Sequence, residues 1–147
     1  MVGPWQRVDR GRQDDMTQHP LRLTPGTDLR NALEGIAKTE GARSGSVLAG
    51  IGSLINPRLR FANRLDEATL TGAFEILNLS GTLTPDGAHL HMSISDEHGR
   101  VFGGHVGYGN EVRTTAEILL MWLSDFHLAR EFDPHTGFKE LVVHRDK

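Results

Sequence analysis

One short segment, residues 88–95, alternates strictly between apolar and polar side chains, and it limits the folds open to this chain. The polar positions hold His89, His91 and two serines, and the apolar positions hold Ala88, Leu90, Met92 and Ile94. Side chains of a β-strand point to opposite faces with a period of two. The pattern therefore predicts a strand with one buried face and one face that carries both histidines.

Other segments also have strand character, and they are residues 21–23, 44–54, 58–61, 69–83, 101–106 and 140–143. Within 69–83 the apolar phase changes after Ile76, which indicates a β-bulge or two buried faces. Residues 112–120 fit either a helix or a strand, because they combine helix formers with an alternating pattern. A short helix is predicted for 121–130.

A first helix is predicted to begin after Thr27 and Asp28, which are good N-cap residues. Its apolar stripe comprises Leu29, Leu33, Ile36 and Ala37. Gly41 is a suitable C′ residue and ends the helix. Residues 1–20 lack an apolar period and are interpreted as a flexible tail, which leaves 21–147 as a single domain.

The composition excludes several classes of protein. The chain has 147 residues, no cysteine and a formal net charge of -3. Thiol nucleophiles, disulfides and iron–sulfur sites are therefore excluded, and nucleic-acid contact would need a local basic patch. The longest strongly apolar run, residues 118–123, is far shorter than the roughly 20 residues of a membrane span. We expect a cytoplasmic protein without a membrane partner.

His89, His91 and His105 form a candidate metal site if the hairpin after residue 95 has the right length. A three-residue loop, with Gly99 in the left-handed conformation, pairs Asp96 with Arg100 and sets His91 opposite His105. A two-residue loop would put His105 on the other face. A similar three-residue loop at Pro85-Asp86-Gly87 would set Gly81 opposite His91.

Three neutral imidazoles are typical ligands of zinc or another divalent transition metal, with a fourth position open. The alternative is three histidines without a metal. Glu75 and Glu117 are candidate carboxylates for supporting the ligands or for acting as a catalytic base.

Basic residues gather at two places. Arg58, Arg60 and Arg64 are candidate contacts for nucleic acid or another anion, although the alternative is a sheet edge protected by charge. In the tail, Arg10-Gly11-Arg12 is similar to the core of an AT-hook, but Gln13 replaces the expected proline and neighbouring aspartates would repel phosphate.

Several motifs in order resemble the PPC domain, the plants-and-prokaryotes conserved family. They are Arg58-Leu59-Arg60-Phe61-Ala62-Asn63, Gly72-Ala73-Phe74-Glu75-Ile76-Leu77, Leu79-Ser80-Gly81-Thr82-Leu83, His89-Leu90-His91, Gly103-Gly104-His105 and Thr114-Thr115-Ala116-Glu117. The resemblance implies an α+β fold, with a twisted, mainly antiparallel sheet and a few helices, that assembles as a homotrimer. It also implies that residues 112–120 form a strand. Ala73 stands where the plant motif has arginine, and Asn110 where many bacterial relatives have cysteine.

Two hypotheses about function follow. The first is a stand-alone prokaryotic-type PPC protein, a trimeric metal-binding module with a DNA-binding or regulatory role. The second is a three-histidine zinc enzyme, such as a hydrolase that acts on a small molecule. A purely structural oligomer without metal is a third possibility.

Overall fold

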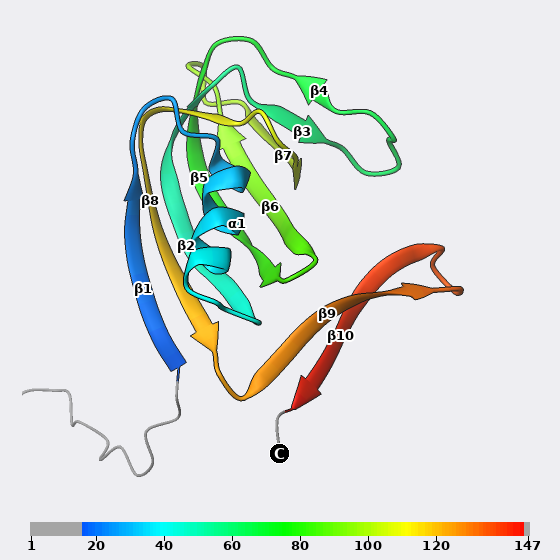
Figure 1. Cartoon of the computed structure of the whole chain (residues 1–147). Helices are drawn as coiled ribbons and strands as arrows, with labels where there is room; N and C mark the ends of the chain where they lie inside the picture. Colours follow the sequence, from blue (N-terminus) through cyan, green and yellow to red (C-terminus); the bar gives the residue numbers. More distant parts are fainter. Residues whose placement is uncertain (1–15, 146–147) are drawn as a thin grey trace, which may run out of the picture.

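The computed structural model describes residues 16–145, which form ten β-strands and one α-helix (Figure 1). In chain order the elements are β1 (Met16–Leu23), α1 (Leu29–Thr39), β2 (Gly45–Ile55), β3 (Arg58–Arg60), β4 (Ala68–Thr69), β5 (Ala73–Thr84), β6 (Gly87–Ser95), β7 (Val101–Val106), β8 (Glu111–Leu123), β9 (Phe126–Asp133) and β10 (Phe138–Arg145). Eight strands form one sheet in the order β1-β8-β2-β5-β6-β7-β3-β4, and β9 and β10 form a second. All these strand pairs are antiparallel, which confirms the predicted fold class.

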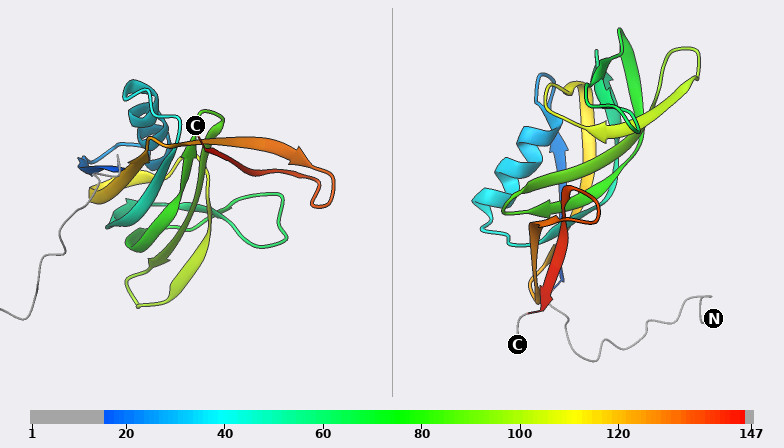
Figure 2. Two further views of the ribbon diagram at one scale, coloured as in Figure 1. Left: turned by 90° about the horizontal axis from the view of Figure 1, so that it is seen from below. Right: turned by 90° about the vertical axis from the view of Figure 1, so that its right-hand side faces the viewer.

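Helix α1 begins and ends where the sequence predicts. The Asp28 side chain caps its first turn by accepting a hydrogen bond from the backbone N–H of Asn31 at 2.9 Å. Gly41 follows the C-cap residue Glu40. Leu29 and Leu33 are fully buried against the sheet, and the helix lies across one face of it (Figure 2). Within residues 16–145 no helix has the length and apolar character needed to span a membrane.

The sheet consequently has two unlike faces, here named the helix face, which α1 covers, and the outer face. On β6 the side chains of Leu90, Met92 and Ile94 are buried in the core on the helix face. His89 and His91 alternate with them and are exposed on the outer face. The apolar and polar side chains that alternate in the sequence of residues 88–95 therefore lie on opposite faces of β6, as predicted.

Strand β5 contains the predicted bulge. Ile76 pairs with Ile94 but Asn78 pairs with Ser93, so Leu77 is an extra residue without a partner. Its side chain is 48% exposed, whereas Ile76 and Leu79 are buried on the helix face. The change of apolar phase in the sequence thus marks this bulge.

The β5–β6 hairpin differs from the prediction by one residue. Thr84 pairs with Gly87, so the loop is the two residues Pro85 and Asp86, and Gly81 lies opposite Leu90 instead of His91. The Thr84 hydroxyl stabilises the tighter turn by accepting from the Asp86 N–H and donating to the Gly87 carbonyl. Gly87 is consequently the first residue of β6 rather than the last residue of the loop.

The predicted helix at 121–130 is wrong. Strand β8 continues to Leu123, and the chain returns as β9 after a turn at residues 124–125. β8 lies between β1 and β2, and their backbone hydrogen bonds outweigh the modest helix propensity of its last residues. β9 and β10 form a hairpin that extends away from the main sheet (Figure 1).

Strand β1 begins at Met16, five residues before the position predicted for it, so residues 16–20 belong to the sheet and not to the tail. β1 is an edge strand, paired on one side with β8. An edge position tolerates Pro20 and polar side chains. Because these residues do not alternate between apolar and polar, the sequence pattern does not indicate a strand at residues 16–20. The arginines of the AT-hook-like segment lie outside the described residues.

Candidate metal centre

The β6–β7 hairpin sets the register that brings two histidines together. The Asp96 N–H donates to the Arg100 carbonyl and the Gly99 N–H donates to the Asp96 carbonyl, both at 3.0 Å. The Asp96 carboxylate also accepts hydrogen bonds from the N–H groups of His98 and Arg100 at 2.9 Å. With this loop closed, His91 pairs directly with His105, as the sequence predicts.

His89 joins this pair because it lies two residues before His91 on the same strand and face. Nδ1 of His105 lies 3.0 Å from Nε2 of His91 and 3.3 Å from Nε2 of His89. One nitrogen from each of the three rings lies within 4.8 Å of the other two. Two imidazole nitrogens bound to one tetrahedral zinc at about 2.0–2.1 Å would lie about 3.3–3.4 Å apart. Two of the three nitrogen–nitrogen distances are therefore close to the spacing that one metal ion requires.

The surroundings keep two of the rings unprotonated. Burial, and then the positive charge of Arg60, lowers the pKa of His105 from 6.5 to about 4. Burial, and then the charge of Arg130, also lowers the pKa of His89. A neutral ring offers a lone pair to a metal, so both residues are ready to act as ligands at neutral pH.

Arg130 and Glu140 are the neighbours that the sequence did not reveal. Arg130 lies on β9, and its guanidinium donates to the Thr82 hydroxyl at 2.7 Å. Thr82 pairs with His89, so this contact places Arg130 beside the histidines. Glu140 on β10 acts on His89 in the opposite sense to Arg130. Both residues belong to the β9–β10 hairpin, part of which the sequence pattern predicts as a helix, and no local signal connects them with β6.

Glu75 and Glu117 do not join the site. Glu75 pairs with Ser95, four residues along β6 from His91, which corresponds to roughly 13 Å along the strand. Glu117 lies on β8, which is three strands from β6, or about 14 Å across the sheet. Among the described residues, the cluster that could hold a metal consists of the three histidines alone.

The three candidate arginines are near one another but differ in their contacts. Arg58 forms an ion pair with Glu67 at 3.1 Å, and Arg64 forms one with Asp66 at 3.3 Å. Arg60 donates to the backbone carbonyl of Arg64 and pairs with His105 across β3 and β7. Arg60 therefore belongs to the surroundings of the histidines as well as to the basic cluster.

Asn110 has a structural role at the start of β8. It is fully buried, and its side-chain oxygen accepts from the Arg58 N–H at 2.8 Å. Its amide donates to the carbonyls of Arg58 and Gly107 at 3.0 and 3.1 Å. These bonds join the start of β3 to the segment between β7 and β8, and Asn110 is not a member of the histidine cluster.

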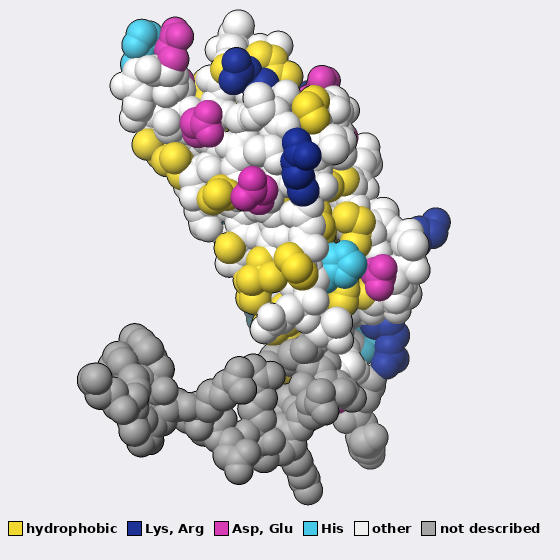
Figure 3. All heavy atoms as spheres, turned by 90° about the vertical axis from the view of Figure 1, so that its left-hand side faces the viewer, with side chains coloured by type: hydrophobic (Ala, Val, Ile, Leu, Met, Phe, Trp, Pro, Cys, Tyr) yellow, Lys and Arg dark blue, Asp and Glu magenta, His cyan; other side chains and the backbone are white. Residues whose placement is uncertain are grey.

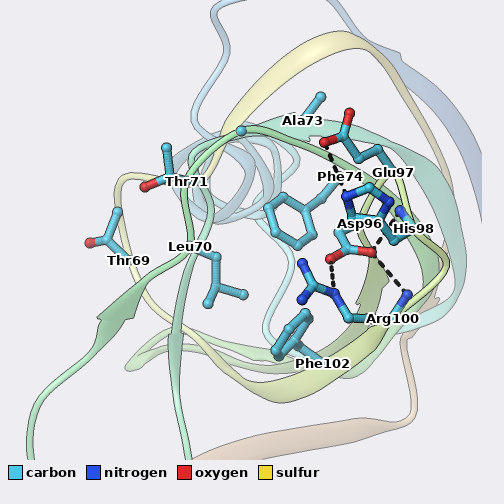
Figure 4. Close-up of a pocket in the computed structure, with 11 residues that line it drawn as sticks. Thr69, Leu70, Thr71, Ala73, Phe74, Asp96, Glu97, His98, Arg100 and Phe102 are labelled. Carbon is cyan, nitrogen blue, oxygen red and sulfur yellow. Dashed lines mark hydrogen bonds and ion pairs between the residues drawn. The ribbon is translucent and has the colours of Figure 1, made fainter.

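A separate hollow of about 320 Å³ lies where the β6–β7 hairpin meets the residues before β5 (Figure 4). Phe74 and Phe102 meet edge to face in it, with ring centroids 6.1 Å apart. The ion pair between Arg100 and Asp96, at 2.6 Å, lies at its border. None of the three clustered histidines lines this hollow.

Comparison with known structures supports the fold. A hypothetical protein from Salmonella cholerae-suis superposes with a TM-score of 0.87 at 32% identity, over 91% of this chain and 97% of that one. A metal-containing protein from Archaeoglobus fulgidus superposes with a TM-score of 0.76 at 26% identity, over 86% of this chain and 93% of that one.

Comparison with curated sequences identifies the family. The bifunctional protein GlmU of Synechococcus sp. (strain JA-3-3Ab) is 42% identical over 86% of this chain, which spans 20% of that protein's length. The AT-hook motif nuclear-localized protein 27 of Arabidopsis thaliana is 32% identical over 67% of this chain and 36% of its own length. The chain thus spans about a fifth to a third of the curated relatives it matches. Because residues 10–124 match the family's profile, the chain belongs to the Plants and Prokaryotes Conserved (PCC, also written PPC) domain family.

Proposed function

We propose that this protein is a metal-binding PPC-domain module in which His89, His91 and His105 hold one divalent transition metal ion, with zinc as the first candidate. The observation that carries the proposal is the convergence of three imidazole nitrogens, two of them 3.0 and 3.3 Å from Nδ1 of His105. Three neutral nitrogen ligands suit zinc, and also nickel, copper or iron. The similarity to a metal-containing protein of Archaeoglobus fulgidus supports this reading.

The module would act as a homotrimer in the cytoplasm. Two apolar surfaces support association. Ile51 on β2 is 55% exposed on the outer face, beside a shallow and mainly apolar hollow of about 590 Å³. Figure 3 shows hydrophobic side chains gathered among charged ones on this side of the molecule.

The second apolar surface lies on the β9–β10 hairpin, where Phe132 and Phe138 are 66% and 68% exposed. A two-stranded hairpin is marginally stable alone, so contacts with another copy would stabilise it. Sedimentation at micromolar concentration should give three subunits, and a monomer would contradict this part of the proposal.

A DNA-binding or regulatory role is the biological context that we propose. The resemblance to a plant protein named for its AT-hook motif supports it. Arg58, Arg60 and Arg64 are the candidate phosphate contacts. Two of these three are already paired with carboxylates, so we expect binding to be weak and dependent on salt.

A metal-dependent hydrolase is the second candidate, because three protein ligands leave a fourth position where zinc could activate water. A base within reach of that water would assist such an enzyme. Glu75 and Glu117 lie on distant parts of the sheet, Glu140 acts on His89 as a nearby charge from β10, and the histidine cluster itself includes no carboxylate among the described residues. We therefore favour binding over hydrolysis.

Elemental analysis of the purified protein tests the metal proposal. Protein prepared without chelators and reconstituted with zinc should contain about one metal ion per chain. Alanine at His89, His91 or His105 should remove most of it, because two ligands hold the ion far less tightly than three. His98→Ala is the matched control, since His98 is exposed on the hairpin loop and should leave the metal content unchanged. A wild-type protein without metal would contradict the proposal.

A further inference from the structure

Two arginines approach the three-histidine cluster from opposite sides, and neither is needed to hold a metal. Arg60 comes from β3, on the side of His105. Arg130 comes from β9, on the side of His89. A protein that merely binds a divalent cation gains nothing from fixed positive charges beside it, because they repel the ion. Their position therefore needs a reason other than metal affinity.

Arg60 is fixed directly beside His105. The two residues pair across β3 and β7, and paired residues of antiparallel strands carry their side chains on the same face, with Cβ atoms about 4.5–5.5 Å apart. One terminal nitrogen of Arg60 donates to the Arg64 carbonyl at 3.2 Å. Arg60 forms no ion pair with a carboxylate in residues 16–145, whereas Arg58 and Arg64 each have one. Its charge is thus available on the outer face.

Arg130 is held in place by two hydrogen bonds at the other end of the cluster. Its backbone N–H donates to the Asp86 carboxylate at 2.9 Å, and its guanidinium donates to the Thr82 hydroxyl at 2.7 Å. Thr82 lies opposite His89 in the β5–β6 pair. One guanidinium nitrogen is used in this bond, which leaves other N–H donors for a ligand.

The local charge favours an anion. The three histidines are neutral ligands, so a bound divalent ion would keep its full charge, and Arg60 and Arg130 add two more positive charges. Glu140 is the carboxylate that acts on His89 from β10, and it offsets one of them. A net positive charge remains at a position that faces solvent.

From this arrangement we propose that the open coordination position of the metal takes an oxyanion, a carboxylate or a phosphate group. One oxygen would replace the metal-bound water, and Arg60 and Arg130 would donate hydrogen bonds to the remaining oxygens. Guanidinium groups bind both kinds of oxyanion well because their paired N–H donors match two oxygens. This proposal rests on the metal-binding function proposed above.

Cobalt(II) substitution provides the test, because the visible absorption of cobalt reports directly on its ligands. The wild-type protein and the variants Arg60→Gln, Arg130→Gln and Arg113→Gln are loaded with Co²⁺ in a buffer without carboxylate or phosphate. Arg113 is the matched control, since it is exposed on β8, three strands away from β6. Each sample is titrated with acetate and, separately, with inorganic phosphate, at constant ionic strength maintained with perchlorate. The two titrations decide which oxyanion binds more tightly.

The spectrum of the wild-type protein should change in a saturable way with at least one of the two anions. Arg60→Gln should raise the half-saturating concentration roughly tenfold or more, since a charge-assisted hydrogen bond is lost. Arg130→Gln should do the same, and Arg113→Gln should not. The Co²⁺ titration without anion shows in each variant that the metal site is intact.

Two outcomes would overturn the proposal, and they are distinguishable. The oxyanion proposal is wrong, and the metal function stands, if Co²⁺ binds but neither anion changes its spectrum. The same holds if both anions bind to Arg60→Gln as tightly as they bind to the wild-type protein. If the wild-type protein binds no Co²⁺ at all, the metal function fails and the oxyanion proposal fails with it.

Discussion

His91 and His105 face each other across the β6–β7 hairpin, with Nε2 of the first 3.0 Å from Nδ1 of the second. This contact depends on the length of a loop at the far end of the same hairpin. The three residues from Glu97 to Gly99 set the register, and a loop one residue shorter would turn the His105 side chain to the helix face. The geometry of the candidate metal centre is therefore encoded in a turn that contributes no ligand.

The first prediction concerns this turn. Gly99 has a φ of 76°, and nothing lies within 4 Å of a Cβ built there, so a substitution meets conformational strain without steric clash. Gly99→Ala should lower the free energy of unfolding by about 1–2 kcal/mol, measured by denaturant titration. Gly99→Asn is the control and should cost less, because asparagine adopts the left-handed conformation more readily. Equal stability of all three proteins would contradict this account of the turn.

The second prediction concerns Gly81, where the backbones of β5 and β6 approach closely. A Cβ on Gly81 would lie 2.0 Å from the His89 carbonyl oxygen and 2.9 Å from the Leu90 Cα, and its φ is 149°. Gly81→Ala should therefore destabilise the protein strongly, by more than about 3 kcal/mol, because backbone on both strands must move.

Gly35→Ala is the matched comparison for Gly81. Gly35 lies within α1 with open space around it, so alanine there should raise the free energy of unfolding by about 0.5–1 kcal/mol. Thermal or denaturant unfolding measures both variants. A Gly81→Ala protein as stable as the wild type would show that the β5–β6 register is incorrect.

The third prediction concerns the pH dependence of the metal-free protein. His105 has a pKa of about 4 in the folded state and about 6.5 when unfolded. Between these values the unfolded chain binds a proton that the folded chain does not, so stability falls as the pH drops from 6.5 to 4. The loss is smaller than the roughly 3.4 kcal/mol that a shift of about 2.5 pKa units would give in full, because solvent screens the charges around this partly exposed ring.

His105→Asn should remove this contribution. Denaturant titrations of both proteins with chelator, at several pH values between 4 and 7.5, give the difference in their free energies of unfolding. That difference should change over the stated window and be constant above it, since the groups that do not contact His105 contribute equally to both proteins. A difference that does not vary with pH would contradict the lowered pKa.

The fourth prediction concerns DNA. If the protein binds duplex DNA through Arg58, Arg60 and Arg64, replacing all three with alanine should reduce the slope of log affinity against log salt by up to about 3, because each phosphate contact accounts for about 0.9. Fluorescence anisotropy at several salt concentrations measures this slope. Arg113→Ala is the control. An unchanged slope in the triple variant would assign the contacts to other residues.

Local turn chemistry made much of the site predictable from the sequence. The loop that ends in Gly99 determines the register of its own hairpin, and the period of two determines that His89 and His91 share a face. The N-cap at Asp28 and the bulge after Ile76 were readable for the same reason, since their signals lie within a few residues. In each case the residues that decide the structure are neighbours in the chain.

Features that depend on distant parts of the chain were not predictable. The segment after Leu120 has helix propensity and becomes a strand because β1 and β2 supply its hydrogen bonds. Arg130 reaches the histidines through Thr82, which lies 48 residues earlier in the chain. The Pro85–Asp86 loop is one residue shorter than its sequence predicts, because the Thr84 hydroxyl favours the tighter turn.

X-ray absorption spectroscopy of the zinc-reconstituted protein reports the atoms bound to the metal, and it can therefore show whether the three histidines hold it. We expect a first shell of about four light atoms near 2.0–2.1 Å, three of them with the outer-shell scattering of imidazole rings. His105→Ala should reduce the imidazole contribution or abolish metal binding. A first shell without imidazole scattering, or a protein that retains no zinc after reconstitution, would contradict the claim that His89, His91 and His105 form a metal site.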